Sequence, residues 1–172
     1  GLVGESGCGK STLGLSTIRL VPPPGKIASG RIALGETDII NCSDEEIRKV
    51  RGKRVGYIFQ DPMTALNPAF TIGDQLGEVF RFHQGLSKRE ALKKAADLLY
   101  QVGIPSPASR SKDYPHQLSG GMRQRAMIAM GLGCNPRLII ADEPTTALDV
   151  SIQAQIIGLL KNLCHEHRTA IM

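Results

Sequence analysis

The most informative stretch of this sequence is Gly4-Glu5-Ser6-Gly7-Cys8-Gly9-Lys10-Ser11-Thr12. It matches the pattern G-x-x-x-x-G-K-[ST] and lies between a strand-like segment and a helical one. Glycines let the backbone wrap so that consecutive N–H groups point at one anion. Lys10 would place a cation against the β- and γ-phosphates, and the Ser11 hydroxyl can ligate Mg²⁺. The stretch therefore predicts a nucleoside triphosphate site at a strand-to-helix turn.

Length and composition exclude several classes of protein. The 172 residues are about one domain's worth of chain, and 41% apolar with 22% charged residues is a globular balance. The longest uncharged apolar run, residues 126–134, is far shorter than the roughly 20 residues of a membrane-spanning helix. Four cysteines without a C-x-x-C pair favour reduced thiols in a cytosolic compartment. The net charge of +5 permits an acidic partner without requiring one.

Strand-like and helical segments alternate, as in an α/β protein with a largely parallel sheet. We expect strands at residues 1–3, 31–34, 38–40, 54–59, 137–141 and from 169 onward. We expect helices at residues 11–20, 72–83, 88–102, 119–133 and 151–167. Capping-box spacing predicts helix starts at Ser43 and at Ser87. Residues 60–70 and 103–117 contain several prolines and are expected to be loop or irregular chain.

A second chemical signal is Leu138-Ile139-Ile140-Ala141-Asp142-Glu143, an apolar strand that ends in two carboxylates. Open α/β sheets bind their ligands at this edge. Asp142 would organise the Mg²⁺ shell, and Glu143 would orient or deprotonate the attacking water. Taken alone, the pair could equally be a solvated strand end. Beside the glycine-rich stretch, the catalytic interpretation is favoured.

A third signal is Ser119-Gly120-Gly121, at the start of an expected helix. A serine cap followed by two glycines exposes several N–H groups, which is a second phosphate-binding end in the same chain. A nucleotide held by the first loop leaves this end without a ligand. A two-fold dimer would bring each such end onto the nucleotide of its partner. In isolation, an ordinary helix cap would explain the three residues as well.

The combined motifs resemble the ATP-binding cassette (ABC) proteins over the whole chain. Leu118-Ser119-Gly120-Gly121-Met122-Arg123-Gln124-Arg125 resembles their signature motif, Gln60 their Q-loop glutamine, and Ala147-Leu148-Asp149 their D-loop. The stretches after Gln60 and Asp142 are similar to ATPase subunits of oligopeptide, dipeptide and nickel importers, and Tyr114-Pro115-His116 points the same way. The resemblance implies an α/β P-loop NTPase core with a mostly parallel sheet and a helical ABC subdomain.

The resemblance also implies a role for each matching residue. The nucleotide-binding set is Gly4, Glu5, Ser6, Gly7, Cys8, Gly9, Lys10, Ser11, Thr12, Ser119, Gly120, Gly121 and Asp149. The catalytic set is Glu143 as general base, Gln60 as sensor of Mg²⁺ and water, and Lys10. The Mg²⁺ set is Ser11, Gln60 and Asp142. The Ser119 end would act on the partner's nucleotide, and Asp149 would couple the two sites of the dimer.

Cofactors and partners follow from the same resemblance. We expect ATP and Mg²⁺, a second ABC ATPase subunit in a head-to-tail homo- or heterodimer, and transmembrane permease subunits docked on residues 66–82. The expected role is to energise import, of peptides, from the cytoplasmic face of the cell membrane. The expected ABC-type domain covers residues 1–172, with the helical subdomain at about 71–130. It should be truncated at both ends, because the family's adenine-stacking aromatic residue and switch histidine have no match.

Two alternatives remain at this stage. One is a DNA-associated ABC ATPase, but those carry coiled coils or large insertions, and residues 11–118 are compact and lack sustained heptads. A basic run, Arg48 to Arg54, has little aromatic interleaving with which to stack bases, so no nucleic acid is expected. The other alternative is a nucleotide-binding fragment without catalytic competence.

Overall fold

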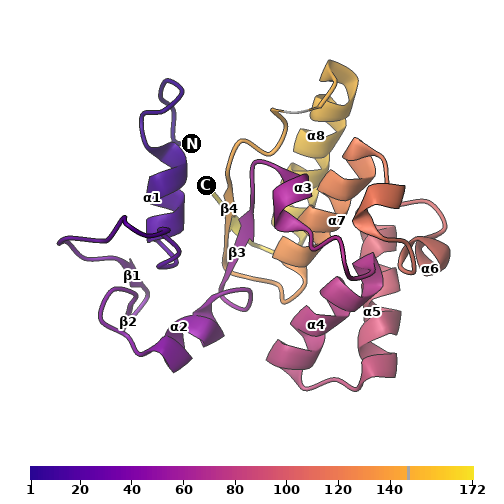
Figure 1. Ribbon diagram of the computed structural model, residues 1–172, viewed down its shortest axis with the longest axis horizontal. Coiled ribbons are helices and arrows are strands. Elements are labelled where there is room, and N and C mark those ends of the chain that lie inside the picture. Colours follow the sequence, from indigo (N-terminus) through magenta and orange to yellow (C-terminus); the bar gives the residue numbers. More distant parts are fainter. Residues whose placement is uncertain (147) are drawn as a thin grey trace.

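The computed structural model describes residues 1–146 and 148–172, and its centre is a three-stranded parallel sheet in the order β3-β4-β5 (Figure 1). The strands are β3 (Val55–Ile58), β4 (Leu138–Ala141) and β5 (Ala170–Ile171). The register sets Ile58 opposite Ala141, and both strands end at the same edge. The Ile58 and Ile139 side chains are fully buried, as in strands covered on both faces. The strands predicted at 54–59 and 137–141 and the α/β class are confirmed.

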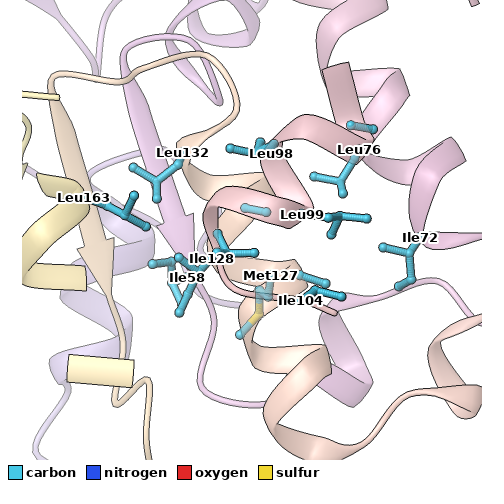
Figure 2. Packing of buried hydrophobic residues seen from close by; sticks show 14 of the residues in the cluster. Ile58, Ile72, Leu76, Leu98, Leu99, Ile104, Met127, Ile128, Leu132 and Leu163 are labelled. Atoms are coloured by element: carbon cyan, nitrogen blue, oxygen red, sulfur yellow. The ribbon is translucent and has the colours of Figure 1, made fainter. Parts of the chain in front are cut away.

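The main helical layer packs against one side of this sheet. Its helices are α4 (Ile72–Gln84), α5 (Lys88–Gln101), α7 (Gly120–Leu132) and α8 (Val150–Glu166). Helices α4 and α5 pack side by side, and α7 contacts both of them as well as β3 (Figure 1). One hydrophobic cluster runs from β3 through α7 to the α4–α5 pair (Figure 2). Its labelled members in that view are Ile58, Ile72, Leu76, Leu98, Leu99, Ile104, Met127, Ile128, Leu132 and Leu163.

Side-chain caps fix where these helices begin. Thr71 accepts a hydrogen bond from the backbone N–H of Asp74 at the start of α4. Ser87 and Glu90 form a reciprocal capping box at the start of α5. Ser119 accepts from the N–H of Met122 at the start of α7. The predicted starts of the three helices are confirmed.

The N-terminal part of the chain forms a smaller second layer. It contains α1 (Lys10–Ser16), an antiparallel pair of β1 (Ala33–Leu34) and β2 (Thr37–Asp38), and α2 (Asp44–Val50). Its core consists of Ile18, Ile39, Ile47 and Val50 together with Val55 of β3 and Ile140 of β4. The first helix is thereby held against the sheet.

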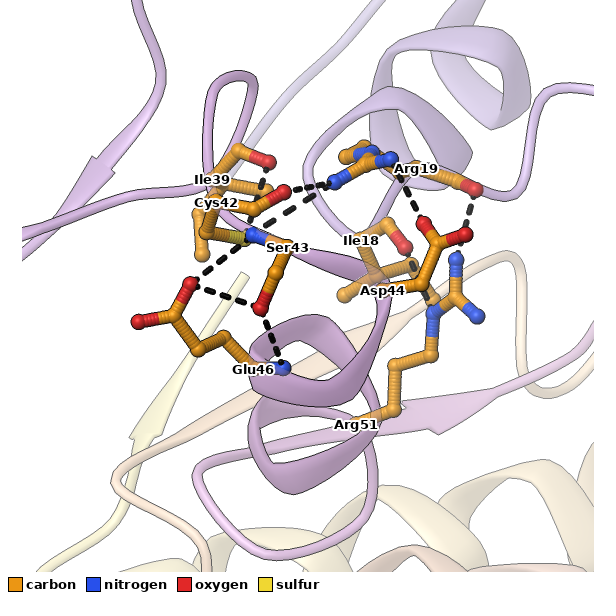
Figure 3. A network of polar contacts seen from close by, with 8 residues as sticks. All are labelled: Ile18, Arg19, Ile39, Cys42, Ser43, Asp44, Glu46 and Arg51. Atoms are coloured by element: carbon orange, nitrogen blue, oxygen red, sulfur yellow. Dashed lines mark hydrogen bonds and ion pairs between the residues drawn. The ribbon is translucent and has the colours of Figure 1, made fainter.

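A polar network joins the chain after α1 to α2 (Figure 3). The Arg19 guanidinium donates to the Cys42 carbonyl at 2.6 Å and pairs with Asp44 at 3.0 Å. Arg51 donates to the carbonyls of Ile18 at 2.8 Å and Arg19 at 2.7 Å. Because these carbonyls follow the last turn of α1, the two arginines fix the position of that helix end relative to α2.

Three predictions near the N-terminus are wrong in detail. Residues 1–3 form no strand, because none of the backbone hydrogen bonds of the described residues pairs them with a neighbouring strand, and Val3 is 95% exposed. Helix α1 ends at Ser16 rather than at residue 20, since Arg19 takes the left-handed conformation (φ 52°) and Leu20 N–H donates to the Leu15 carbonyl. A non-glycine residue in that position gives no sequence signal. The hairpin strands β1 and β2 are also shorter than predicted.

The two segments predicted to be loop contain short helical turns. Helix α3 (Pro62–Ala65) begins at Asp61, whose carboxylate accepts from the N–H of Met63. Helix α6 (Pro107–Arg110) and a 3₁₀ turn (Pro115–Gln117) interrupt the second segment. Proline at the first helical position is compatible with a helix, which explains the error. None of the helices within the described ranges has the length and apolar character required to cross a bilayer.

Candidate active site

The loop between residues 4 and 9 has the backbone geometry that its glycines permit. Gly7 and Gly9 have φ angles of 80° and 98°, in the left-handed region that side chains rarely allow. Gly9 is also the N-cap of α1, so the loop leads directly into that helix. The loop is solvent-exposed. Within the loop, the Cys8 N–H donates to the Glu5 carbonyl at 3.3 Å. Phosphate binding by this loop stays a prediction.

The Lys10 side chain folds back onto the loop that precedes it. Its ammonium donates to the carbonyls of Gly4 and Glu5, both at 2.9 Å, and lies 3.3 Å from a carboxylate oxygen of Glu143. The Lys10 side chain is only 18% exposed. The cation thus lies between the glycine-rich loop and the acidic end of β4.

The two acidic residues after β4 face different partners. The Asp142 N–H donates to the Ile58 carbonyl at 2.9 Å, which places the carboxylate beside β3. Ser11 Oγ donates to Asp142 Oδ1 at 3.0 Å, and the Tyr57 hydroxyl donates to Asp142 Oδ2 at 3.2 Å. A serine hydroxyl and a carboxylate next to a phosphate-binding loop are oxygen ligands of the kind that Mg²⁺ prefers.

Glu143 points toward the loop and the end of β3. Its Oε2 accepts from Gln60 Nε2 at 3.4 Å and from Thr146 Oγ1 at 3.0 Å, while Oε1 faces Lys10. The backbone of Glu143 has a φ of 44°, which is left-handed for a residue with a Cβ. This turn separates the directions of the Asp142 and Glu143 side chains. One carboxylate therefore faces Ser11, and the other faces Lys10, Gln60 and Thr146.

The structure brings together five predicted site residues from three separate segments of the chain: Lys10 with Ser11, Gln60, and Asp142 with Glu143. A cavity of about 80 Å³ lies between Lys10, Asp142 and Glu143. It is too small for a nucleotide, so the ligand would have to lie along the exposed loop. Oxygen atoms of Ser11 and Asp142 lie 3.0 Å apart, and both are ligands that fit Mg²⁺. Gln60 contacts Glu143 through its Nε2, and its part in the Mg²⁺ set stays a prediction. In the described ranges, no group of His, Cys, Asp and Glu forms any other cluster suited to a metal.

The second predicted phosphate-binding end lies elsewhere. Ser119, Gly120 and Gly121 begin α7, and a Cβ at Gly121 would lie 3.3 Å from Ile152 of α8. Asp149 is the exposed N-cap residue of α8. Within the part of the chain that the structure describes, no hydrogen bond or ion pair joins these four residues to residues 4–12. Ala147, which belongs to the predicted D-loop, lies outside the described residues.

Sequence reasoning missed two polar side chains at this site, Tyr57 and Thr146. The sequence identifies Tyr57 only as a strand residue. Strand alternation places it on the same face as Phe59, and the centroids of the two rings lie 4.6 Å apart. Burial, followed by the charge of Asp142 and the hydrogen bond to it, raises the pKa of the Tyr57 hydroxyl. Thr146 follows Glu143 by one turn, and no motif distinguishes it from Thr145.

Comparison with known proteins agrees with this geometry. A family model described as ABC transporter matches residues 1–146. The dipeptide transport ATP-binding protein DppD of Bacillus subtilis is 55% identical over 163 residues, which cover 94% of this chain and 49% of that protein. DppD of Escherichia coli is 52% identical and is covered to 53%, and the oligopeptide transport ATP-binding protein AppD of Bacillus subtilis is 52% identical and is covered to 52%.

The fold also matches solved structures. The ATP-binding cassette MJ0796, in a dimeric post-hydrolysis state bound to ADP and Pi, superposes with a TM-score of 0.81 at 30% identity. That match covers 98% of this chain and 70% of the cassette. The chain spans about half the length of the curated relatives it matches. A family model that covers most of the chain, and relatives more than half identical, lead to one conclusion: the chain belongs to the ABC transporter family, whose cassettes bind nucleotide.

Proposed function

We propose that this chain binds MgATP, hydrolyses ATP and thereby energises a peptide importer. The observation that carries the proposal is the convergence of Lys10, Ser11, Asp142, Glu143 and Gln60 from separate segments onto one site. The relatives named as dipeptide and oligopeptide transport ATP-binding proteins support the peptide substrate class. Their likeness extends over nearly all of this chain.

The chemistry follows from the positions of the side chains. The loop of residues 4–12 would bind the phosphates, and Lys10 would exchange its contacts with the loop carbonyls for phosphate oxygens. Ser11, Asp142 and Gln60 would hold Mg²⁺, which supplies charge neutralisation at the transferred phosphate. Glu143 would accept a proton from the attacking water, with Gln60 and Thr146 orienting its carboxylate.

The proposal includes a dimer because the site of one chain lacks a second phosphate-binding end. Ser119, Gly120 and Gly121 would reach the γ-phosphate bound to the partner, and Asp149 would couple the two sites. The packing of Gly121 on Ile152 supports this, since it links the start of α7 to the segment that Asp149 begins. The solved cassette that this chain resembles is described as dimeric.

The permease would dock beside the α4 helix. A groove of about 360 Å³ is lined by Phe70, Asp74, Glu78, Arg81 and Lys88 among others. Phe70, just before α4, is 54% exposed, and Phe82, near the end of α4, is 66% exposed. Apolar rings beside both signs of charge suit a protein segment more than a small ligand. The groove coincides with the expected docking segment at residues 66–82 and supports a position on the cytoplasmic face of the cell membrane.

We also propose that residues 1–172 belong to one ABC-type ATPase domain in which residues 71–130 form the helical subdomain. The close packing of α4, α5 and α7 supports this division. The hydrophobic cluster of these helices nevertheless continues into β3 and β4. Movement of the subdomain would therefore change the packing around the strand that leads to Gln60.

The proposal is tested by two substitutions in the intact protein, with ATP binding and phosphate release measured separately. Glu143→Gln keeps the size of the side chain but removes its basicity, so we expect turnover to fall about 100-fold or more with ATP binding intact. Lys10→Ala should weaken ATP binding itself. Glu166→Gln, at an exposed residue of α8, is the matched control and should retain wild-type turnover.

Each alternative has its own outcome in this experiment. Wild-type turnover in Glu143→Gln would mean that another group is the base. ATP binding without turnover in the unaltered protein would identify a nucleotide-binding subunit without catalysis. Turnover stimulated by DNA, and not by reconstitution with permease and peptide, would favour the DNA-associated class.

A further inference from the structure

Both oxygens of the Asp142 carboxylate are held by hydroxyl groups. Ser11 Oγ donates to Oδ1 at 3.0 Å from the first turn of α1. The Tyr57 hydroxyl donates to Oδ2 at 3.2 Å from the middle of β3. A carboxylate turns easily about its last side-chain bond, and its two oxygens are equivalent until neighbours distinguish them. Here the two donors come from different elements, so the carboxylate has one preferred rotation.

Two neighbours, Phe59 and Gly14, lie close to the Tyr57 side chain. The ring is half-buried and lies 4.6 Å from the ring of Phe59. On the other side, α1 crosses the strand at Gly14, and a Cβ built there would lie 2.8 Å from the Tyr57 hydroxyl oxygen. The absence of a side chain at Gly14 therefore provides the space in which the hydroxyl reaches Asp142.

We propose that Tyr57 is a positioning residue for the magnesium site: by binding Oδ2, it holds Asp142 so that Oδ1 stays on Ser11. A serine hydroxyl has one proton and two lone pairs. When its proton is directed to Asp142, its lone pairs are left for a cation to bind. Tyr57 thus acts on Mg²⁺ through Asp142 and Ser11, without coordinating the metal. This inference rests on the proposed function, since it concerns the same nucleotide site.

The test is Tyr57→Phe in the intact protein, which removes one oxygen and preserves the ring. Binding of a fluorescent ATP analogue is measured in EDTA and then over a Mg²⁺ titration, together with the thermal unfolding midpoint. We expect the Mg²⁺ concentration at half-saturation to rise about tenfold, as for other groups that orient a metal ligand. Analogue affinity in EDTA and the unfolding midpoint should match the wild type. Tyr100→Phe, at a 73% exposed tyrosine of α5, is the control and should leave all three values unchanged.

A double-mutant cycle with Ser11→Ala tests the route of the effect. If Tyr57 acts through Asp142 and Ser11, then Tyr57→Phe should add little to the Mg²⁺ shift already caused by Ser11→Ala. Full additivity of the two shifts would overturn the proposal. The cycle compares the Mg²⁺ shift caused by Tyr57→Phe with and without Ser11→Ala. A general loss of stability caused by Tyr57→Phe is present on both sides of that comparison.

The remaining outcomes are distinct. A Mg²⁺ midpoint within about twofold of wild type in Tyr57→Phe overturns the inference while leaving the proposed function intact. A lower unfolding midpoint and weaker EDTA binding with no change in Mg²⁺ dependence would show a structural role only, and also overturns it. If the wild-type protein binds nucleotide without any dependence on Mg²⁺, the proposed function fails and the inference with it.

Discussion

At the scale of single residues, the site depends on a backbone conformation that is unfavourable by itself. Glu143 has a φ of 44°, and a left-handed conformation costs a residue with a Cβ about 1–2 kcal/mol. Contacts with Lys10, Gln60 and Thr146 offset that cost. The strained turn aims adjacent carboxylates in different directions. A relaxed strand would also separate them, but it would place Glu143 on the opposite face from Asp142 rather than toward Lys10.

A glycine in α1 provides a stability test at this scale. Alanine normally favours a helix over glycine by about 1 kcal/mol. In Gly14→Ala, the new Cβ would lie 2.8 Å from the Tyr57 hydroxyl and 3.3 Å from Ile140 Cγ2. We expect the free energy of unfolding, measured by urea denaturation, to fall by about 1–3 kcal/mol because the site is overpacked.

Gly158 of α8 is the matched control, since a Cβ there would meet nothing within 4 Å. Gly158→Ala should raise the free energy of unfolding by about 0.5–1 kcal/mol through helix propensity alone. If Gly14→Ala raised the free energy of unfolding to the same extent, Tyr57 would have to move away from the new Cβ at no cost in free energy. The close approach of Gly14 to the Tyr57 hydroxyl would then not constrain Tyr57.

At the scale of elements, the sequence predicts best where a local signal and tertiary packing agree. Helices α4, α5 and α7 begin at Thr71, Ser87 and Ser119, and each of these side chains accepts the expected hydrogen bond. The end of α1 was not predictable, because Arg19 adopts a left-handed conformation held by contacts with α2. Those contacts are distant in sequence, so no local pattern reports them.

The cap of α5 gives the prediction for this scale. Ser87→Ala removes the hydroxyl that accepts from the Glu90 N–H and donates to the Glu90 carboxylate, while the backbone N–H of residue 87 can still donate to that carboxylate. We expect the free energy of unfolding to fall by about 1 kcal/mol. Ser151→Ala, at an exposed serine of α8, should change it by less than about 0.5 kcal/mol. Equal effects of the two substitutions would mean that packing against α4, and not the cap, sets the start of α5.

The same distinction applies to the site. Lys10, Ser11, Gln60, Asp142 and Glu143 were predictable because each belongs to a motif with fixed spacing. Tyr57 and Thr146 were not, because their roles follow from the approach of β3 to β4 and from the turn after Glu143. Motifs thus identify the groups that we propose to touch the ligand. Residues that orient those groups become visible only once the strands are placed.

At the scale of the whole molecule, one close approach joins the helical layer to the sheet. Gly56 of β3 and Gly131 of α7 are both buried where the helix crosses the strand. A Cβ at Gly131 would lie 3.2 Å from Ile58 Cγ1, and a Cβ at Gly56 would collide with the Gly131 carbonyl oxygen. Because β3 leads to Gln60 and Ser119 caps α7, this crossing sets the position of the Gln60 end of β3 relative to α7.

Gly56→Ala should therefore be the most damaging of the small substitutions considered. Its Cβ meets the backbone of α7, which cannot rotate away as a side chain can, so the helical layer must shift from the sheet. We expect the free energy of unfolding to fall by about 3 kcal/mol or more, measured by urea denaturation of the intact protein. Gly77→Ala is the control, because that Cβ would make ordinary contacts at 3.7 Å between α4 and α5, within the helical layer. Equal stability of the two variants would mean that α7 slides freely on β3, and the crossing would then not fix the position of the Gln60 end of β3 relative to α7.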